Sequence, residues 1–346
     1  MWGLIVNVKQ EYLKQSDFLI STIDCNYCDN AESVCLDIAY GVDQNFLLGC
    51  GVSVASILKH NCNRKLRFHI FIDCFSDADR KMFAALAEQY KTRITIYLIS
   101  CEYLRMLPTT KNWTYAIYFR FAIADYFINK TNKLLYLDAD IICQGSIDEL
   151  ISVSFPDNQV AVVVPEGKSD WWLKRSKSLG TTGIANGYFN SGFLLINLPQ
   201  WAAEYVSFRA IEMLNNPDIT SKITHPDQDV LNILLANKLC FANIKFNTQF
   251  SLNYQLKDKF VNPVTNNTIF IHYIGPTKPW YSWAGGYQVS KPFIDAKMES
   301  PWKDTPLLKP INSNQLRYCA KHMLKNKSYV KGAFYYFLYF IKKVTH

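Results

Sequence analysis

The sequence predicts an α/β protein built on a mostly parallel, mixed sheet. Short apolar runs alternate with segments of helical pattern along the chain, and the apolar runs are continuous rather than alternating. Strands that are buried on both faces read as continuous apolar runs, and alternation of strand and helix is typical of right-handed crossovers in a parallel sheet. With 346 residues, the chain is long enough to bury a large core.

The elements follow in order from these patterns. The first thirty residues are polar and irregular, and we expect them to form an extension. Apolar runs predict strands at 34–40, 66–73, 93–98, 133–137, 160–164 and 192–197. Helical spacing predicts helices at 47–58, 77–90 and 113–126, and two more that begin near Trp201 and Asp229. Segment 165–187 has no clear pattern and predicts a loop that folds over a site.

The strand predicted at 133–137 ends in two carboxylates, Asp138 and Asp140, which are separated by Ala139. Ligands of open α/β sheets bind where the strands end at their carboxyl edge. Two carboxylates at this spacing in extended chain point the same way and supply hard oxygen ligands for a divalent cation that also holds phosphate. Taken alone, the pattern is more typical of a strand followed by an Asp that caps the next helix.

The net charge of +8 belongs to the end of the chain. Residues 301–346 contain nine basic residues and one acidic residue, whereas the first 300 residues are neutral overall. The same segment contains the aromatic run 334–340, and basic residues beside aromatic ones favour an anionic membrane surface. The alternative is a solvated helix whose aromatic side chains pack on the body of the protein. We do not expect nucleic acid as a partner, because no binding motif accompanies the charge.

The composition is that of a folded protein without a membrane span. No window approaches the ~18 apolar residues of a spanning helix, and the apolar run 3–6 is too short for a signal peptide. We therefore expect a cytoplasmic protein, and ten cysteines fit a reducing compartment. The single CxxC, Cys25 to Cys28, lacks a second pair, so zinc is not expected there. The sequence contains no P-loop, GxSxG or HExxH, and Gly49-Cys50-Gly51 lacks the third glycine of a dinucleotide fingerprint.

Six segments in order resemble the retaining sugar-nucleotide glycosyltransferases of family 8, which include bacterial lipopolysaccharide galactosyl- and glucosyltransferases. These segments are 39–46, 118–120, 134–140, 189–197, 227–229 and 272–280. The resemblance implies a single GT-A-type nucleotide-sugar domain, which we place at 31–300 between the extension 1–30 and a basic, aromatic, helical tail at 301–346. Residues 300–304, Ser-Pro-Trp-Lys-Asp, and the tail resemble the extension of enterobacterial lipopolysaccharide outer-core hexosyltransferases.

This resemblance assigns roles to individual residues. Asp138, Asp140 and His272 would hold Mn²⁺ or Mg²⁺, which stabilises the charge that develops on the leaving diphosphate. Asp43 and Asn45 would contact the uracil and ribose, Lys278 with Gly275 the diphosphate, and Arg120 the donor phosphate or sugar. The full set implied for donor binding is Gly41, Asp43, Asn45, Arg120, Asp138, Ala139, Asp140, Asn190, Ser191, Gly275 and Lys278.

Recognition of the sugar and the chemistry would fall to Asn190, Ser191, Asp227 and Gln228. The last two would be the catalytic residues, with Gln228 on the β-face of the anomeric carbon. Because an amide is a poor nucleophile, we expect the acceptor hydroxyl to attack from the side that the diphosphate leaves. A covalent intermediate on a nearby carboxylate remains the alternative.

The sequence therefore predicts a metal-dependent enzyme that transfers glucose or galactose from its UDP derivative to the lipopolysaccharide outer core, at the cytoplasmic face of the inner membrane. The choice between the two donor sugars stays open, as does another glycan or glycolipid acceptor. A sugar nucleotidyltransferase would need a glycine-rich, basic loop after the first strand, and residues 40–45 contain no Lys or Arg. A non-catalytic module that binds membrane or glycan is the third alternative.

Overall fold

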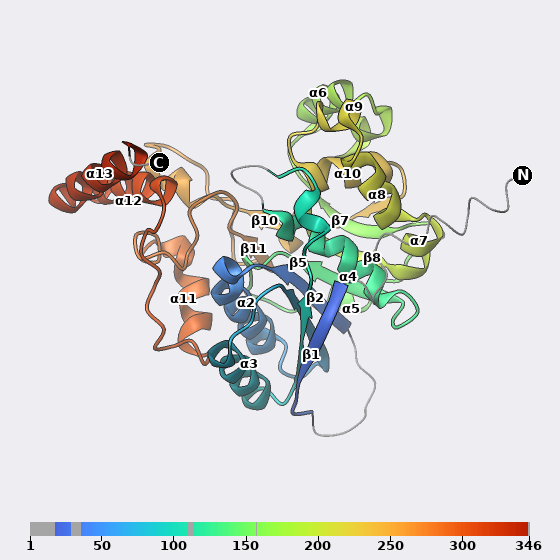
Figure 1. Cartoon of the computed structure of the whole chain (residues 1–346), viewed down its shortest axis with the longest axis horizontal. Coiled ribbons are helices and arrows are strands. Elements are labelled where there is room, and N and C mark those ends of the chain that lie inside the picture. The colour runs from blue at the N-terminus through green and yellow to red at the C-terminus, as the bar shows by residue number, and fades with distance from the viewer. Residues whose placement is uncertain (1–17, 29–35, 110–113, 157, 345–346) are drawn as a thin grey trace, which may run out of the picture. The chain divides into compact units, whose positions relative to one another are not determined.

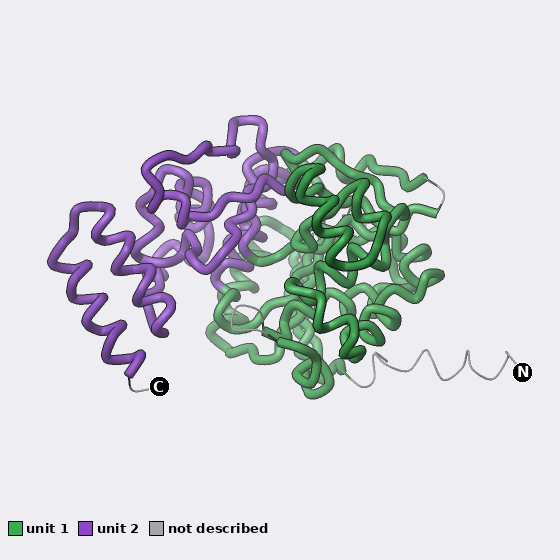
Figure 2. Tube along the Cα trace, turned by 90° about the horizontal axis from the view of Figure 1, so that it is seen from above, with its two compact units in different colours: residues 1–47, 62–139, 147–246 green, residues 48–61, 140–146, 247–346 purple. Residues whose placement is uncertain are grey.

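The computed structural model describes residues 18–28, 36–109, 114–156 and 158–344 (Figure 1). The chain forms two compact units, each assembled from segments that are distant in the sequence (Figure 2). Unit 1 comprises residues 1–47, 62–139 and 147–246, and unit 2 comprises residues 48–61, 140–146 and 247–346. The boundaries that we place at 30/31 and 300/301 stay a prediction.

The described part of unit 1 contains an eight-stranded mixed sheet with the strand order β1-β4-β3-β2-β5-β8-β7-β9. Strands β2, β3, β4 and β5 run parallel to one another, whereas β8 runs antiparallel to both β5 and β7. The strands are β1 (Leu19–Asn26), β2 (Leu36–Val42), β3 (Leu66–Ile72), β4 (Arg93–Ile99), β5 (Lys133–Leu137), β7 (Ala161–Pro165), β8 (Phe189–Asn197) and β9 (Leu239–Phe241).

The helices of unit 1 connect these strands. They are α3 (Asp77–Gln89), α4 (Phe119–Phe127), α5 (Asp148–Ile151), α6 (Ser169–Leu179), α7 (Leu198–Ala203), α8 (Val206–Leu214), α9 (Pro217–Thr220) and α10 (Pro226–Leu234), with short 3-10 turns at Gln44–Phe46, Leu104–Met106, Tyr115–Tyr118, Thr182–Asn186 and Ile244–Phe246. A capping box between Ser76 and Asp79 starts α3, and Phe83 and Leu86 on its inner face are buried.

Two predictions for unit 1 were wrong. Part of the predicted irregular extension forms β1, which pairs antiparallel with β4; residues 1–17 lie outside the described residues. Strand β1 is at the edge of the sheet and mostly exposed, so it lacks the apolar run by which buried strands are found.

The second wrong prediction is the patternless loop at 165–187, which contains helix α6 and a 3-10 turn. Gly180 ends α6 with a φ of 67°, a left-handed conformation that glycine adopts without strain. Leu179, Ile184 and Tyr188 form a small buried cluster, and Trp172 packs against it. A cluster this small gives a weak periodic signal. Helix α4 likewise begins later than predicted, at Phe119 after a 3-10 turn.

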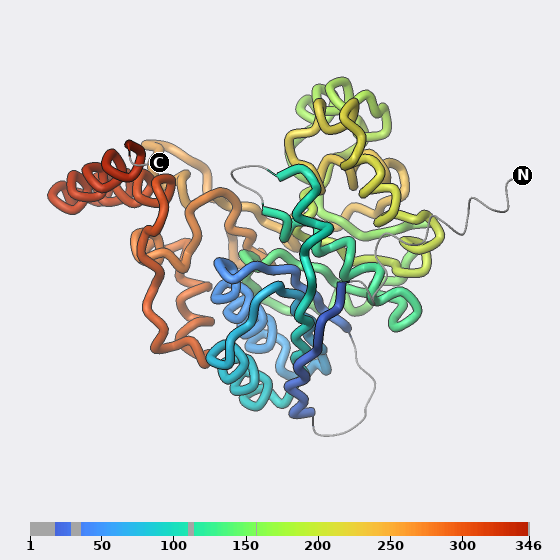
Figure 3. The backbone as a smooth tube through the Cα atoms, viewed as in Figure 1, coloured from blue at the N-terminus to red at the C-terminus, as the bar shows by residue number. Residues whose placement is uncertain are grey.

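Unit 2 contains a three-stranded sheet in the order β10-β11-β6, together with helices that are partly from the C-terminal tail. The Ser53 hydroxyl of α2 donates to the Ile141 carbonyl of β6 at 2.6 Å. The last two helices pack side by side as a hairpin (Figure 3). The elements are α2 (Leu47–His60), β6 (Ile141–Cys143), β10 (Thr248–Gln249), β11 (Phe270–His272), α11 (Lys291–Met298), α12 (Ser313–Lys325) and α13 (Tyr329–Val344), with 3-10 turns at Leu252–Leu256 and Gln288–Ser290.

Close packing of β2 against α4 explains the glycine near the end of β2. A Cβ atom added to Gly41 would lie 2.5 Å from the Phe119 Cβ atom, which is far inside van der Waals contact. Both Phe119 and the neighbouring Ile123 are fully buried. The glycine therefore lets the helix approach the strand that leads to Asp43.

We expect Gly41→Ala to lower the free energy of unfolding by about 1–3 kcal/mol, because the new methyl group overpacks the contact between β2 and α4. Urea unfolding followed by circular dichroism measures the change. Gly286→Ala is the matched control, since a Cβ there meets no atom within 4 Å. Equal stability of the two variants would contradict the packing explanation.

Candidate active site

Asp138 follows β5 directly, at the carboxyl edge of the parallel strands. Its backbone N–H donates to the Gly192 carbonyl at 2.8 Å, which holds the residue beside the start of β8. Its Oδ1 atom accepts hydrogen bonds from Arg120 Nη2 at 3.1 Å and from the Tyr136 hydroxyl at 3.0 Å. About 30% of the Asp138 side chain stays exposed, so the carboxylate remains accessible to a ligand.

Arg120 joins two of the predicted site carboxylates. Its guanidinium is buried and lies 3.0 Å from Asp227 Oδ2 as well as beside Asp138. It also donates to the Ser191 carbonyl at 2.5 Å, and the Ser191 hydroxyl donates to Asp227 Oδ2 at 2.8 Å. A buried carboxylate is costly unless it is paired and hydrogen-bonded, and Arg120 and Ser191 supply these partners for Asp227. Its predicted contact with the donor stays a prediction.

The predicted sugar residues of β8 and α10 lie together. Gln228 Oε1 accepts a hydrogen bond from Asn190 Nδ2 at 3.0 Å and another from the Ser191 backbone N–H at 3.2 Å. Gln228 Nε2 donates to Glu166 Oε2 at 3.0 Å and to the Tyr188 hydroxyl at 3.1 Å. The structure thus brings together the four residues to which we assign sugar recognition, Asn190, Ser191, Asp227 and Gln228.

Asp140, in unit 2, is surrounded by positive charge. Lys278 Nζ donates to Asp140 Oδ2 and, at 2.7 Å, to the Tyr273 carbonyl. His272 Nε2 lies 3.1 Å from Asp140 Oδ1. Burial raises the pKa of the Asp140 carboxyl, but Lys278 and His272 outweigh it and lower that pKa below its usual range. The carboxylate is therefore ionised and ready to act as a ligand.

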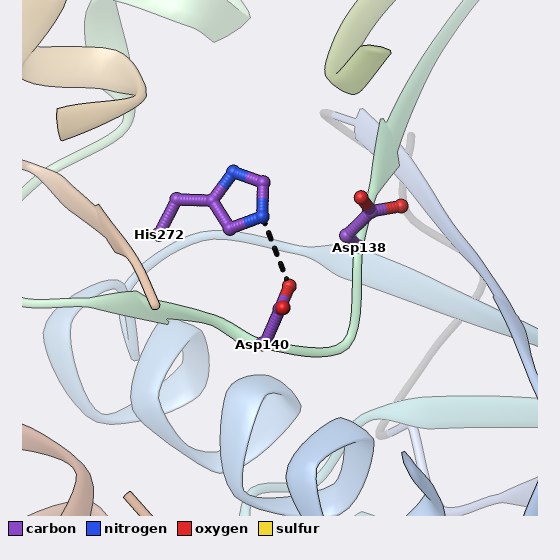
Figure 4. A group of neighbouring side chains, drawn as sticks. All are labelled: Asp138, Asp140 and His272. Atoms are coloured by element: carbon purple, nitrogen blue, oxygen red, sulfur yellow. Dashed lines mark ion pairs between the residues drawn. The ribbon is translucent and has the colours of Figure 1, made fainter. Parts of the chain in front are cut away.

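The residues around Asp140 fit a cation. His272 Nδ1 lies 3.0 Å from Asn247 Oδ1, which holds the ring with Nε2 on the side of Asp140. Asp140 Oδ1 is buried, and His272 Nε2 faces it at 3.1 Å. One possible ligand atom each from Asp138, Asp140 and His272 lies within 4.8 Å of the others (Figure 4). Two carboxylates and an imidazole suit Mn²⁺, although Mg²⁺ also takes carboxylate oxygens.

The remaining predicted donor residues have local structural roles as well. Asp43 accepts from the Asn45 backbone N–H at 2.9 Å and caps the turn Gln44–Phe46, and Asn45 itself is exposed. Gly275 has a φ of 82°, and a Cβ there would lie 3.1 Å from Ser251 Oγ. Ala139 is buried between the two aspartates. The donor contacts of Gly41, Asp43, Asn45 and Gly275 stay predictions.

The sequence analysis missed two residues of the Gln228 cluster. Glu166 follows β7, which runs parallel to β5 because both are antiparallel to β8, so Glu166 stands at the same sheet edge as Asp138. That position, a carboxylate directly after a predicted strand, is a signal that could have found it. Tyr188 gives no such signal, because an aromatic residue before a strand is typical of core packing.

Solved structures establish the class of the fold. The galactosyltransferase LgtC, crystallised with donor and acceptor sugar analogues, resembles this chain with a TM-score of 0.65 at 24% identity, covering 77% of this chain and 96% of that chain. This likeness confirms the predicted fold class, an α/β glycosyltransferase fold of GT-A type.

The family follows from the sequence. The model named "Glycosyl transferase family 8" matches residues 37–284, and the model of the family's C-terminal region matches residues 287–343. The chain therefore belongs to glycosyl transferase family 8, as its six ordered segments predict.

Two curated relatives match nearly the whole chain. The lipopolysaccharide glucosyltransferase WaaO of Escherichia coli K12 is 67% identical over 98% of this chain and 100% of that protein. The lipopolysaccharide 1,3-galactosyltransferase of Salmonella typhimurium LT2 is 56% identical over 95% of this chain and 98% of that protein.

Replacing Arg120 by Met should lower the free energy of unfolding by about 3–5 kcal/mol, because Asp138 and Asp227 then lose their shared buried cation. Denaturant unfolding monitored by tryptophan fluorescence measures it. Arg93→Met is the control: Arg93 pairs with Asp24, but both side chains are about 40% exposed, so the loss should stay below about 1 kcal/mol. A similar small loss for both variants would show that Arg120 is not needed for charge compensation.

Proposed function

We propose that this protein is a retaining hexosyltransferase that moves glucose or galactose from a UDP-sugar to the lipopolysaccharide outer core. The observation that carries the proposal is the 67% identity to a lipopolysaccharide glucosyltransferase over 98% of the chain. Because the chain is also 56% identical to a 1,3-galactosyltransferase, both UDP-glucose and UDP-galactose are candidate donors. Because the glucosyltransferase shares more of the sequence, UDP-glucose is the first donor to assay.

The geometry around Asp140 supports a divalent cation at the donor site. Asp138, Asp140 and His272 would hold it, and it would neutralise charge that develops on the leaving diphosphate. Lys278 now occupies one oxygen of Asp140. With a cation held at Asp140, the Lys278 ammonium would no longer be needed for this compensation and would be available to the diphosphate, with Gly275 allowing close approach of the backbone. Arg120 would add a second fixed positive charge behind Asp138.

We propose that transfer retains the donor's α configuration, as the resemblance to family 8 implies, and the arrangement around Gln228 argues against a covalent intermediate on this residue. Its amide lies among Asn190, Ser191 and Glu166, and an amide is a poor covalent nucleophile. We therefore favour attack by the acceptor hydroxyl on the face that the diphosphate leaves, with the departing phosphate oxygen taking the hydroxyl proton. Proton NMR of the product would show an α-linkage.

Asp140→Asn should lower transfer from UDP-glucose or UDP-galactose to truncated lipopolysaccharide by about a thousandfold or more, since a charged metal ligand is lost. Excess chelator should lower the transfer rate of the wild-type protein to a similar extent, and added Mn²⁺ or Mg²⁺ should restore that rate. Release of UDP measures the rate. Pyrophosphate chemistry instead of UDP release would point to a nucleotidyltransferase.

Asp295→Asn provides the matched control for this experiment. The Asp295 side chain is 43% exposed and pairs with Lys291 one helical turn away, so the loss of its charge should leave the rate unchanged. Full activity of the wild-type protein in excess chelator would rule out the cation.

Helix α13 supports the proposed membrane contact. Val330, Phe334, Phe337, Ile341 and Val344 recur at heptad spacing and are all exposed. The helix contains Lys331, Lys342 and Lys343 but no acidic residue. No helix in the part of the chain that the structure describes has the length and apolarity to cross a bilayer. We propose that this exposed apolar face, the α13 stripe, lies on an anionic membrane surface with the lysines at the headgroups.

Binding to vesicles that contain anionic phospholipid should weaken steeply as ionic strength rises, because each basic residue near the surface contributes about 1 kcal/mol that salt screens. The double variant Phe334→Ser/Phe337→Ser should bind at least tenfold more weakly in a sedimentation assay, whereas Val261→Ser, at an 88% exposed residue outside α13, should bind normally. Failure of the wild-type protein to sediment with vesicles at low salt would exclude this contact.

A further inference from the structure

The amide of Gln228 has all of its hydrogen-bonding capacity in use. Its oxygen accepts from the Asn190 side chain and the Ser191 backbone, and its nitrogen donates to Glu166 and Tyr188. An amide has two acceptor positions and two donor hydrogens. A sugar hydroxyl can therefore bond to Gln228 only by replacing one of these four partners.

Two of the four partners are fixed and two are exchangeable. The Ser191 N–H belongs to the buried backbone of β8, and Tyr188 is fully buried. Asn190 and Glu166 are only half-buried side chains. Sugar hydroxyls can therefore take the positions of Asn190 and Glu166, while Tyr188 and Ser191 continue to hold the amide.

The direction of the Tyr188 bond is set by Asp229. The Tyr188 hydroxyl has one hydrogen, which it donates to Asp229 Oδ1 at 2.6 Å, so its oxygen must accept from Gln228. Asp229 is fully buried and accepts further bonds from Arg175, Thr224 and His225. Burial and the neighbouring Asp229 carboxylate raise the pKa of the Tyr188 phenol, so the hydrogen remains on Tyr188 throughout the neutral range.

A reversed amide would be unfavourable at every fixed partner. The Gln228 oxygen would then face the Tyr188 oxygen and the Glu166 carboxylate, and its NH₂ group would face the Ser191 N–H. Buried polar groups that lose their partners cost about 1–3 kcal/mol each. Tyr188, whose hydroxyl hydrogen is directed to Asp229, therefore acts together with the Ser191 N–H to select a single orientation of the Gln228 amide.

We propose that Tyr188 is a positioning residue that fixes the Gln228 amide for recognition of sugar hydroxyls. With Tyr188 in place, Gln228 offers a donor hydrogen where Glu166 now lies and an acceptor lone pair where Asn190 now lies. This inference rests on the proposed function and assigns a role within its sugar site. Asp229 acts only through Tyr188, because its oxygens are already occupied by donors.

A double-mutant cycle of Tyr188→Phe and Gln228→Ala tests the proposal. Calorimetric affinities for UDP-glucose or UDP-galactose and for UDP alone are measured in the presence of Mn²⁺. Tyr188→Phe should weaken binding of the better UDP-hexose about five- to tenfold, because one hydrogen bond of the amide is lost, and leave UDP binding unchanged. In the Gln228→Ala background, Tyr188→Phe should have no further effect.

Tyr97→Phe is the matched control, because the Tyr97 hydroxyl is also buried but bonds to His69. It should leave UDP-hexose binding unchanged. If Tyr188→Phe weakens UDP and UDP-hexose alike, or weakens UDP-hexose equally in the Gln228→Ala background, the positioning role is wrong. Should Tyr188→Phe fail to fold, a crystal structure of the wild-type protein with UDP-hexose decides instead: sugar hydroxyls bonded to Gln228 while the Tyr188–Gln228 bond is kept support the role, and loss of that bond overturns it.

The binding cycle also separates this inference from the proposed function. If the wild-type protein binds UDP-hexose and shows the predicted coupling but glycosylates no lipopolysaccharide, the proposed acceptor is wrong and the positioning role stands. If it glycosylates lipopolysaccharide and the cycle is additive, the proposed function stands and the role of Tyr188 is overturned.

Discussion

Compensation of buried negative charge is the constraint on which the rest of this structure depends. In unit 1, Arg120 lies against both Asp138 and Asp227, and Arg175 pairs with the fully buried Asp229. In unit 2, Lys278 and His272 face Asp140. Removing ionised carboxylates from water is costly unless cations and hydrogen bonds replace the solvent. Arg120 and Arg175 supply these partners in unit 1, and in unit 2 Lys278 and His272 lower the pKa of the Asp140 carboxyl, so that this carboxylate can bind a cation.

Much of the candidate site near the end of β5 could be predicted, because the residues there form a clear sequence pattern. The buried strand β5 matches the predicted range 133–137, and the following Asp138 and Asp140 stand where ligands of α/β sheets bind. The ordered family segments added His272, Asp227 and Gln228, which no spacing rule connects with the aspartates. The strand pattern thus identified Asp138 and Asp140 as candidate ligands. The resemblance to a family was needed to place the other residues in the same site.

The sequence could not show which partner each polar group takes. The resemblance assigns Lys278 to the diphosphate, whereas in the structure its buried ammonium bonds to Asp140, a pairing that no sequence pattern indicates. Tyr188 orients an amide 40 residues away in the sequence, and only tertiary structure brings the two together. Helix α6 and the edge strand β1 were missed for a related reason: each buries too little apolar surface to give a clear periodic pattern.

A crystal structure of the protein with Mn²⁺ and a non-hydrolysable UDP-hexose would show what compensates Asp140 when donor is bound, because anomalous scattering locates the cation. We expect an anomalous peak coordinated by Asp138, Asp140 and His272, with the Lys278 ammonium moved from Asp140 to the diphosphate. A cation bound elsewhere, or a diphosphate bound while Lys278 still pairs with Asp140, would contradict this expectation.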